Sequence, residues 1–280
     1  MAAIGERIAA AYRRAVARLG ERPALTDDYI IETRGLTKEF KGFVAVGGVD
    51  LKVRRGAIHA LIGPNGAGKT TVFNLLTKFL EPSRGQILYQ GRDITRARPA
   101  DLARQGMVRS FQISAIFPHL SVLENVRVAL QRELGTSFHF WRSEASLERL
   151  NERAMALLDA VGLEGLAASL AGELPYGRKR ALEIATTLAL EPETMLLDEP
   201  TAGMGHEDVG RVAELIRRVA AERTVLMVEH NLSVVADLSD TITVLARGQI
   251  LAEGSYDEVS GNPEVREAYM GTGAGRTGHG

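Results

Sequence analysis

The sequence contains no cysteine among its 280 residues, and it has no excess of charge of either sign. The absence of cysteine excludes disulfide bonds, thiolate catalysis and zinc or iron–sulfur sites with cysteine ligands, and it suits a reducing compartment. The 34 basic and 35 acidic residues leave a formal net charge of −1. No overall positive field therefore indicates a nucleic-acid partner, and we expect none.

Long hydrophobic runs are also missing. No apolar stretch approaches the ~20 residues that a membrane-spanning helix needs, and the first residues lack the apolar segment of a signal peptide. We therefore expect any link to a membrane to run through the protein surface or through a partner. With 45% hydrophobic residues, the chain has enough apolar material for the core of one large or two small domains.

A glycine-rich stretch, GPNGAGKTT at Gly63–Thr71, organises the rest of the chain. It follows an apolar run over 57–62, which predicts a buried strand, and it precedes a helical pattern over 72–76. In this context the pattern G-x-x-x-x-G-K-[ST] indicates a phosphate site rather than a turn that only caps a helix. The sequence therefore predicts a nucleoside triphosphate site.

Each kind of residue in this phosphate loop has a physical role. The glycines let the backbone approach a ligand, and successive N–H groups point into one concavity at a helix N-terminus. Lys69 adds a positive charge for the β- and γ-phosphates, and the Thr70 hydroxyl is placed to ligate Mg²⁺. The expected nucleotide-binding residues are Gly63, Pro64, Asn65, Gly66, Ala67, Gly68, Lys69, Thr70 and Thr71.

Two adjacent acids, Asp198 and Glu199, end a second apolar stretch at 194–197. Ligands bind at the carboxyl ends of strands in open α/β sheets, so we expect both acids at the edge where the phosphate loop lies. Asp198 would hold Mg²⁺ through its water shell, and Glu199 would accept a proton from the attacking water or polarise it. The alternative is an acidic pair that only caps the next turn before Pro200.

Two further strand ends carry polar groups. His230 follows the apolar strand 225–228, where it could hydrogen-bond a γ-phosphate oxygen, although a lone histidine at a strand end is more often structural. Gln112 ends a strand predicted at 107–111, where its amide could ligate the metal or orient water. Together, four consecutive strand ends would deliver polar groups to one nucleotide.

From residue 29 onward, strand patterns alternate with helix patterns, which indicates a mainly parallel sheet covered on both faces. Strand patterns give way to helical ones over about 113–172, which indicates a helical insertion. The expected strands are 30–33, 49–53, 57–62, 86–89, 107–111, 195–197, 224–228 and 241–245. The expected helices are 100–105, 122–134, 147–158, 180–190 and 208–221.

Residues 2–19 predict an amphipathic helix in which apolar residues recur at three- and four-residue spacing. Four arginines and one glutamate give this segment a side-chain charge of +3. Such a helix can lie on an anionic membrane surface or dock to a partner. The alternatives are a transit peptide, whose usual serines are missing, and a solvated or frayed extension. Residues 20–28 read as the linker that follows.

The ordered motifs resemble those of the ATP-binding subunits of ABC transporters, from Ile30 to Met270. The phosphate loop resembles Walker A, and MLLDEP at 195–200 resembles Walker B with its catalytic glutamate. Gln112 is at the position of the Q-loop glutamine, and His230 is at that of the switch histidine. The remaining matches are Phe40 for the aromatic residue on adenine, 201–205 for the D-loop, and Leu174, Pro175, Tyr176, Gly177 and Arg178 for the LSGGQ signature.

The resemblance implies an α/β P-loop NTPase core with a mainly parallel sheet, an antiparallel β subdomain and a helical subdomain at about 113–172. The ATPase domain would span 29–271, between the N-terminal extension 1–28 and a flexible tail 272–280. ATP and Mg²⁺ would be the cofactors of an ATP hydrolase. A second ATPase subunit and membrane-spanning permease subunits would be its partners, at the cytoplasmic face of the cell membrane.

Flanking residues narrow the resemblance to subunits that drive uptake of branched-chain amino acids, or of urea and short amides. These residues are Tyr-Gly in the signature with LEIA at 182–185, and NPEVREAYMG at 262–271. In such importers a periplasmic binding protein completes the system. The alternatives are a lipopolysaccharide export cassette, whose nucleotide motifs would read the same, and a non-transport cassette.

The signature departs from LSGGQ. Pro175 replaces the serine and removes both a hydroxyl and a backbone donor. Tyr176 replaces the first glycine, so the backbone cannot approach a ligand as closely. Arg178 stands where glutamine is usual. We therefore expect a weak signature in this chain and a heterodimer with a different ATPase subunit.

Overall fold

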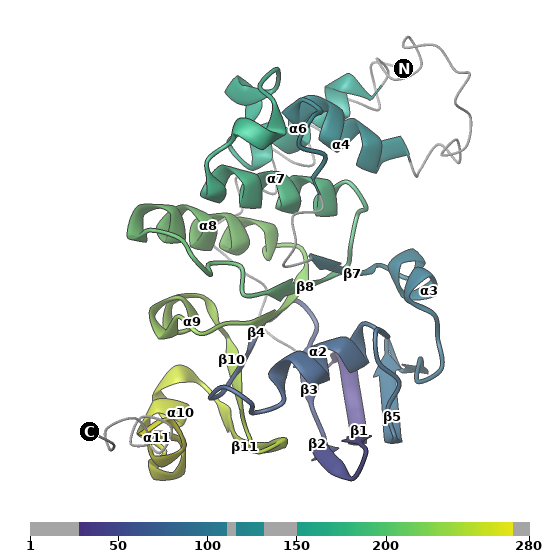
Figure 1. The fold of residues 1–280 in the computed structure, drawn as a ribbon, viewed down its shortest axis with the longest axis vertical. Coiled ribbons are helices and arrows are strands. Elements are labelled where there is room, and N and C mark those ends of the chain that lie inside the picture. Colours follow the sequence, from purple (N-terminus) through teal and green to yellow (C-terminus); the bar gives the residue numbers. More distant parts are fainter. Residues whose placement is uncertain (1–27, 111–115, 132–149, 271–280) are drawn as a thin grey trace.

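The computed structural model describes residues 28–110, 116–131 and 150–270, and all structural statements concern these ranges. The chain forms two sheets with helices, and α4, α6 and α7 are gathered at the end of the molecule opposite to β1 and β2 (Figure 1). The expected α/β class is therefore confirmed. The predicted N-terminal helix, its linker up to residue 27, Gln112 and the tail 272–280 lie outside the described residues.

The larger sheet has six strands in the order β11-β10-β4-β9-β8-β7. All neighbours are parallel except β10 and β11, which are antiparallel. The strands are β4 (Ile58–Ile62), β7 (Met107–Ser110), β8 (Thr194–Asp198), β9 (Thr224–Val228), β10 (Thr241–Ala246) and β11 (Gln249–Gly254). The carboxyl ends of the parallel strands therefore meet at one edge, as the sequence predicts.

Both faces of this sheet are covered, and the alternation along β4 shows how. Ile58, Ala60 and Ile62 belong to one core cluster, with apolar residues of the helices α7, α8 and α9. Leu61 points to the opposite cluster, which contains the apolar face of α2. The bounds of these helices are α2 (Lys69–Leu76), α7 (Tyr176–Leu188), α8 (His206–Val219) and α9 (Leu232–Leu238).

The smaller sheet is antiparallel and corrects one sequence prediction. Its strands are β1 (Tyr29–Phe40), β2 (Phe43–Val49), β3 (Lys52–Arg54), β5 (Arg84–Tyr89) and β6 (Arg92–Asp93). A single strand over 49–53 is wrong, because β2 ends at Val49 and β3 begins at Lys52. Gly47 and Gly48 lie inside β2, where an extra residue bulges out against β1 and Gly48 has a φ of 70°.

Three of the remaining helices match helices that the sequence predicts. The expected helices at 100–105, 122–134 and 147–158 correspond to α3 (Pro99–Arg104), α4 (Val122–Leu130) and α6 (Asn151–Ala160). A capping box of Ser121 and Glu124 fixes the start of α4. Short 3-10 turns occur at Glu164–Leu166 and Ala171–Glu173, and the helices α10 (Tyr256–Gly261) and α11 (Pro263–Met270) follow β11. Within the described ranges, no helix is both long and apolar enough to cross a membrane.

Candidate functional site

The phosphate loop connects β4 to α2, and its backbone conformation requires glycine at two points. Gly63 has a φ of 149°, and a Cβ there would lie 2.1 Å from the Leu245 carbonyl oxygen. Gly68 has a φ of 102°, and a Cβ there would lie 2.7 Å from the carbonyl oxygen of Ala45. Any side chain at either position would push the loop away from β10 or β2.

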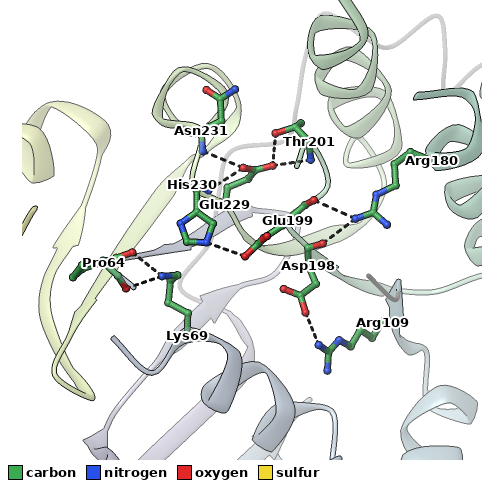
Figure 2. A network of polar contacts seen from close by, with 11 residues as sticks. Pro64, Lys69, Arg109, Arg180, Asp198, Glu199, Thr201, Glu229, His230 and Asn231 are labelled. Carbon is green, nitrogen blue, oxygen red and sulfur yellow. Dashed lines mark hydrogen bonds and ion pairs between the residues drawn. The ribbon is translucent and has the colours of Figure 1, made fainter. Parts of the chain in front are cut away.

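The start of α2 has the properties of an anion site. Its N-cap, Gly68, supplies no side-chain acceptor, and the first turn contains no acidic residue. The orphan N–H groups and the positive end of the helix dipole therefore favour a negatively charged ligand. Lys69 Nζ donates hydrogen bonds to the carbonyl oxygens of Gly63 at 2.6 Å and Pro64 at 2.9 Å (Figure 2).

The charge on Lys69 is set by two opposing effects. Burial lowers the pKa of Lys69, and the negative charge of Glu199 acts in the opposite direction. A lysine that is partly desolvated beside a carboxylate is poised to exchange its backbone acceptors for phosphate oxygens.

A cleft of about 470 Å³ opens over this loop. Phe40, predicted to stack on adenine, lines the cleft together with a second aromatic residue, Phe43, which the sequence analysis missed. Both rings are well exposed, at 42% for Phe40 and 69% for Phe43, so either offers a flat apolar surface to a base. The other lining residues are Ala45, residues 65–71, Glu199 and His230.

Asp198 ends β8 in a buried position, where its carboxylate is paired with Arg109. Arg109 Nη2 lies 2.5 Å from Asp198 Oδ2, and Nη1 donates to Asn74 Oδ1 at 2.6 Å. The guanidinium also lies over the rings of Phe73 and Phe79. The sequence analysis missed Arg109, and the only signal was a single arginine in an apolar strand.

Glu199 has the unusual backbone that functional residues often show. Its φ is 46°, a left-handed conformation that residues with a side chain rarely adopt. The Glu199 amide donates to the Val228 carbonyl at 2.9 Å, which ties the end of β8 to β9. Glu199 Oε1 lies 2.8 Å from His230 Nε2 (Figure 2). The two residues predicted to serve catalysis from these strand ends are therefore in direct contact.

Glu229, which the sequence analysis missed, organises the loops after β8 and β9. Its carboxylate is buried and accepts from the amide and the hydroxyl of Thr201, at 2.9 and 2.6 Å. It also accepts from the amides of His230 at 2.9 Å and Asn231 at 3.2 Å. A buried carboxylate with several donors is a stable anchor, and here it joins the loop after Walker B to His230.

Arg180 links α7 to the same strand end. Its guanidinium is buried and donates to the carbonyl oxygens of Asp198 at 2.9 Å and Glu199 at 3.2 Å. The same group pairs with Glu183 at 2.6 Å within α7. Helix α7, at whose start the predicted signature lies, is therefore attached to the backbone of Asp198 and Glu199.

The signature residues lie apart from the phosphate loop. Pro175 is the N-cap of α7 and provides no side-chain acceptor, and Tyr176 is 51% exposed. Gly177 and Arg178 line a different cleft of about 610 Å³, between α7 and α8, and Leu174 is buried. The Arg178 guanidinium donates to the Gly162 carbonyl at 2.7 Å.

The described chain therefore brings together some of the predicted residues. The phosphate loop, Phe40, Glu199 and His230 share one cleft, and Asp198 lies at the strand end beside it. The signature does not join them, and Gln112 lies outside the described residues. The glycine-lined loop and the uncapped helix fit a polyphosphate, and hard oxygen donors on Thr70 and Asp198 fit Mg²⁺.

Two family matches agree with this geometry. The family described as ABC transporter matches residues 46–202, and the family described as branched-chain amino acid ATP-binding cassette transporter matches residues 249–275. Among solved structures, an ATP-binding cassette of an ABC transporter in its ADP conformation has a TM-score of 0.77. That cassette is 32% identical, and the match covers 87% of this chain and 99% of the other.

Curated relatives cover nearly the same length. The chain is 40% identical over 249 residues to BraF of Pseudomonas aeruginosa, a high-affinity branched-chain amino acid transport ATP-binding protein. It is 37% identical over 254 residues to LivG of Escherichia coli, which has the same description. Each match covers 86% of this chain and 98% of the relative.

Proposed function

The chain belongs to the ATP-binding subunits of ABC transporters, and we propose that it hydrolyses ATP to drive the uptake of branched-chain amino acids. The observation that carries this proposal is the meeting of the phosphate loop, Glu199 and His230 in one cleft. The cargo rests on the relatives' transport of branched-chain amino acids and on the family match at 249–275.

The chemistry assigns a role to each group in the cleft. Lys69 and the first-turn amides of α2 bind the phosphates, and Thr70 and Asp198 would hold Mg²⁺, which would supply charge neutralisation at the phosphates. Glu199 accepts a proton from the water that attacks the γ-phosphate. His230 orients Glu199 through the 2.8 Å contact, and Phe40 stacks on the base.

Arg109 adds an element to this scheme that the motifs do not contain. Its ion pair holds the Asp198 carboxylate in one orientation at the end of β8. The contact of Arg109 with Asn74 ties the same carboxylate to α2, the helix that follows the phosphate loop. The helix that carries Thr70 and the Asp198 carboxylate, the two groups that would hold Mg²⁺, are thus connected through Arg109.

The subunit works in a pair, at the cytoplasmic face of the membrane, with permease subunits that carry the cargo across. The partner ATPase is a different chain, because the signature of this one lacks the serine hydroxyl and the first glycine. A periplasmic binding protein delivers the amino acid to the assembled importer. In the pair, closure on ATP and opening after hydrolysis shift the permease between two states.

The cargo is tested by reconstituting this chain with the permease and ATPase subunits encoded beside it and with their binding protein. We expect leucine, isoleucine or valine to stimulate ATP hydrolysis and to accumulate in the vesicles, and urea to do neither. Stimulation by urea alone would overturn the cargo assignment. Export of lipid by the reconstituted vesicles, without uptake of solute, would overturn the proposed direction of transport.

The pairing is tested with the same components. Alone, this chain would form sites with a weak signature on both sides, so its turnover should be low. Adding the second ATPase subunit and the permease should raise turnover by about tenfold or more, which corresponds to ~1.4 kcal/mol of transition-state stabilisation. Equal rates for the chain alone and for the assembled transporter would contradict a heterodimer.

A further inference from the structure

A buried arginine of α7 binds the turn that follows β8. Arg180 is 5% exposed, and its guanidinium donates to the carbonyl oxygens of three consecutive residues. Nη2 donates to Asp198 at 2.9 Å and to Glu199 at 3.2 Å (Figure 2). Nε donates to Pro200 at 3.3 Å. One side chain of α7 therefore contacts the backbone of Glu199 and of both its neighbours.

The backbone of Glu199 needs such support. The pairing of β8 with β9 ends at Asp198 and Val228, and Glu199 then adopts a φ of 46°. A residue with a side chain keeps this left-handed conformation only where its surroundings fix it. The Glu199 amide donates to the Val228 carbonyl at 2.9 Å, and the Glu199 carbonyl accepts from Arg180 and from the Ala202 amide at 3.1 Å. Glu199 is therefore fixed by β9 at its amide and by α7 and the turn itself at its carbonyl.

Glu183 allows the Arg180 charge to be buried and fixes its orientation. Glu183 Oε2 lies 2.6 Å from Arg180 Nη1, and both side chains are 6% exposed. A guanidinium presents its donors in fixed directions within one plane, whereas the donors of a lysine ammonium group start from one atom. A lysine at this position could pair with Glu183 or reach a carbonyl oxygen, but it could not bind the carboxylate and all three carbonyls together.

The position of the Glu199 carboxylate depends on this backbone. Glu199 lines the cleft over the phosphate loop, and its Oε1 lies 2.8 Å from His230 Nε2. A change of φ at residue 199 would turn the side chain away from His230 and from the cleft. Misplacing a reacting group by about 1 Å can lower a rate by about 10²-fold.

We propose that Arg180 is a positioning residue for hydrolysis, which holds the backbone of Glu199 so that its carboxylate stays in the nucleotide cleft. This inference rests on the proposed role of Glu199 as the base. It gives α7 a second function in addition to the predicted signature at its start. The second turn of this helix supports hydrolysis of the nucleotide that the chain itself binds.

The test compares Arg180→Lys with Arg217→Lys in the assembled transporter. Arg217 of α8 is the matched control, because it also pairs with a glutamate three residues away, Glu214 at 2.6 Å, and bonds a second element through Asp237 at 2.7 Å. We expect Arg180→Lys to lower turnover by about 10- to 100-fold and to leave the ATP affinity of the isolated chain within about twofold of the wild type. The control should match the wild type in both. Wild-type turnover of Arg180→Lys would overturn the proposal.

A double-mutant cycle with Glu199→Gln separates positioning from a general structural role. If Arg180 acts through the Glu199 carboxylate, Arg180→Lys should lower the rate by less than about twofold in the Glu199→Gln background, because the base that it positions is already absent. Single-turnover hydrolysis measures these low rates. An equal loss in both backgrounds would overturn the proposal, in favour of a structural role.

A second variant keeps the test decisive if Arg180→Lys does not fold. Arg180→Met combined with Glu183→Leu removes both charges, so no unpaired charge is left in the interior. We expect the same fall in turnover with ATP affinity retained. Wild-type turnover of this double variant would show that the guanidinium does not position Glu199.

The same cycle distinguishes this inference from the proposed function. If Glu199→Gln alone leaves turnover unchanged, the proposed base is wrong, and Arg180 has nothing to position. If Glu199→Gln lowers turnover and Arg180→Lys does not, the proposed chemistry stands, and only the role of Arg180 fails.

Discussion

The starts of α2 and α7 are alike in one respect and different in most others. Both helices begin without a side-chain cap, and neither has an acidic residue in its first turn. By contrast, α4 and α10 begin with complete capping boxes. Two helix starts therefore keep N–H groups available to an anion where the chain could have supplied a side chain.

The surroundings of the two helix starts differ. The start of α2 lies in a cleft with Lys69, Glu199 and an aromatic ring. The start of α7 has an exposed Tyr176, and the nearest arginine, Arg178, is bonded to Gly162. One region contains the groups proposed for binding and hydrolysis. The other faces residues of α8 across a separate cleft, which contains neither the phosphate loop nor Glu199. This difference supports the proposal that the chain provides one nearly complete half-site and a second half-site that a partner chain completes.

The largest effect should come from removing the proposed base at the first region. Glu199→Gln keeps the size of the side chain and removes its ability to accept a proton. We expect turnover of the assembled transporter to fall by about 10²–10⁴, with ATP affinity retained. Steady-state hydrolysis and equilibrium binding measure the two quantities. Glu222→Gln, at an exposed position, should change neither. A loss of less than about tenfold would remove Glu199 from this role.

Next in size is the loss of the phosphate-binding charge. Lys69→Ala deletes a cation and its bonds to the Gly63 and Pro64 carbonyls. Hydrogen bonds to charged groups contribute ~1.5–3 kcal/mol, so ATP should bind about 10- to 100-fold more weakly. The isolated chain suffices for this titration, because the first region does not depend on a partner. Lys52→Ala in β3 is the control. Equal ATP affinity of the two variants would show that Lys69 does not bind the phosphates, and the start of α2 would then lose its difference from the start of α7.

The sequence predicts the first region well because the pattern there is local. The run from β4 through the loop to α2 occupies consecutive residues, and glycine at 63 and 68 is required by the backbone itself. Strand β9 ends at Val228, as predicted. The carboxyl ends of β4, β8 and β9 then meet because parallel pairing leaves them no other arrangement.

What the sequence does not predict depends on contacts between distant residues. Arg109 and Asp198 are 89 residues apart, and Thr201 and Glu229 are 28 residues apart. No pattern along the chain pairs them. The helices α9, α10 and α11, with 7, 6 and 8 residues, were missed, although α3 with 6 residues was predicted. These lengths are shorter than the window of about 11–18 residues in which helical periodicity is visible.

A smaller effect should appear in the pH dependence of stability, because His59 lies in β4, the strand that precedes the phosphate loop. His59 of β4 is buried and donates from Nε2 to Thr243 Oγ1 at 2.8 Å, since that hydroxyl donates to Glu253. Burial lowers the pKa of His59 to about 4. In the unfolded chain the His59 imidazole takes up a proton near pH 6.5, whereas in the folded chain it does so only near pH 4. Stability is therefore lost as pH falls from about 6.5 towards 4, by about 2 kcal/mol at pH 5.

Urea unfolding at pH 7 and pH 5 measures this loss. Other groups also titrate between these values, so His59→Gln is the reference: its amide can still donate to Thr243 but does not titrate. The wild type should lose about 2 kcal/mol more than the variant. Parallel losses in the two proteins would show that His59 is not the group responsible.

The smallest effect should come from a substitution at the start of α7, and it tests most directly whether the starts of α2 and α7 belong to different nucleotide sites. A Cβ at Gly177 would lie 2.7 Å from Asp208 Cγ, so Gly177→Ala must move Asp208 or the start of α7. Gly210 in α8 is the matched control, because a Cβ there would have no heavy atom within 4 Å. Gly210→Ala should even stabilise the fold, by ~0.5–1 kcal/mol, through helix propensity.

In the assembled transporter we expect Gly177→Ala to lower turnover by about tenfold, or ~1.4 kcal/mol, and Gly210→Ala to leave it unchanged. Titrated alone, both variants should bind ATP as the wild type does, since the start of α7 acts only on the partner's nucleotide. If Gly177→Ala weakened ATP binding in the isolated chain, as Lys69→Ala should, the two helix starts would belong to one site. The distinction between a nearly complete half-site and an incomplete one would then be wrong.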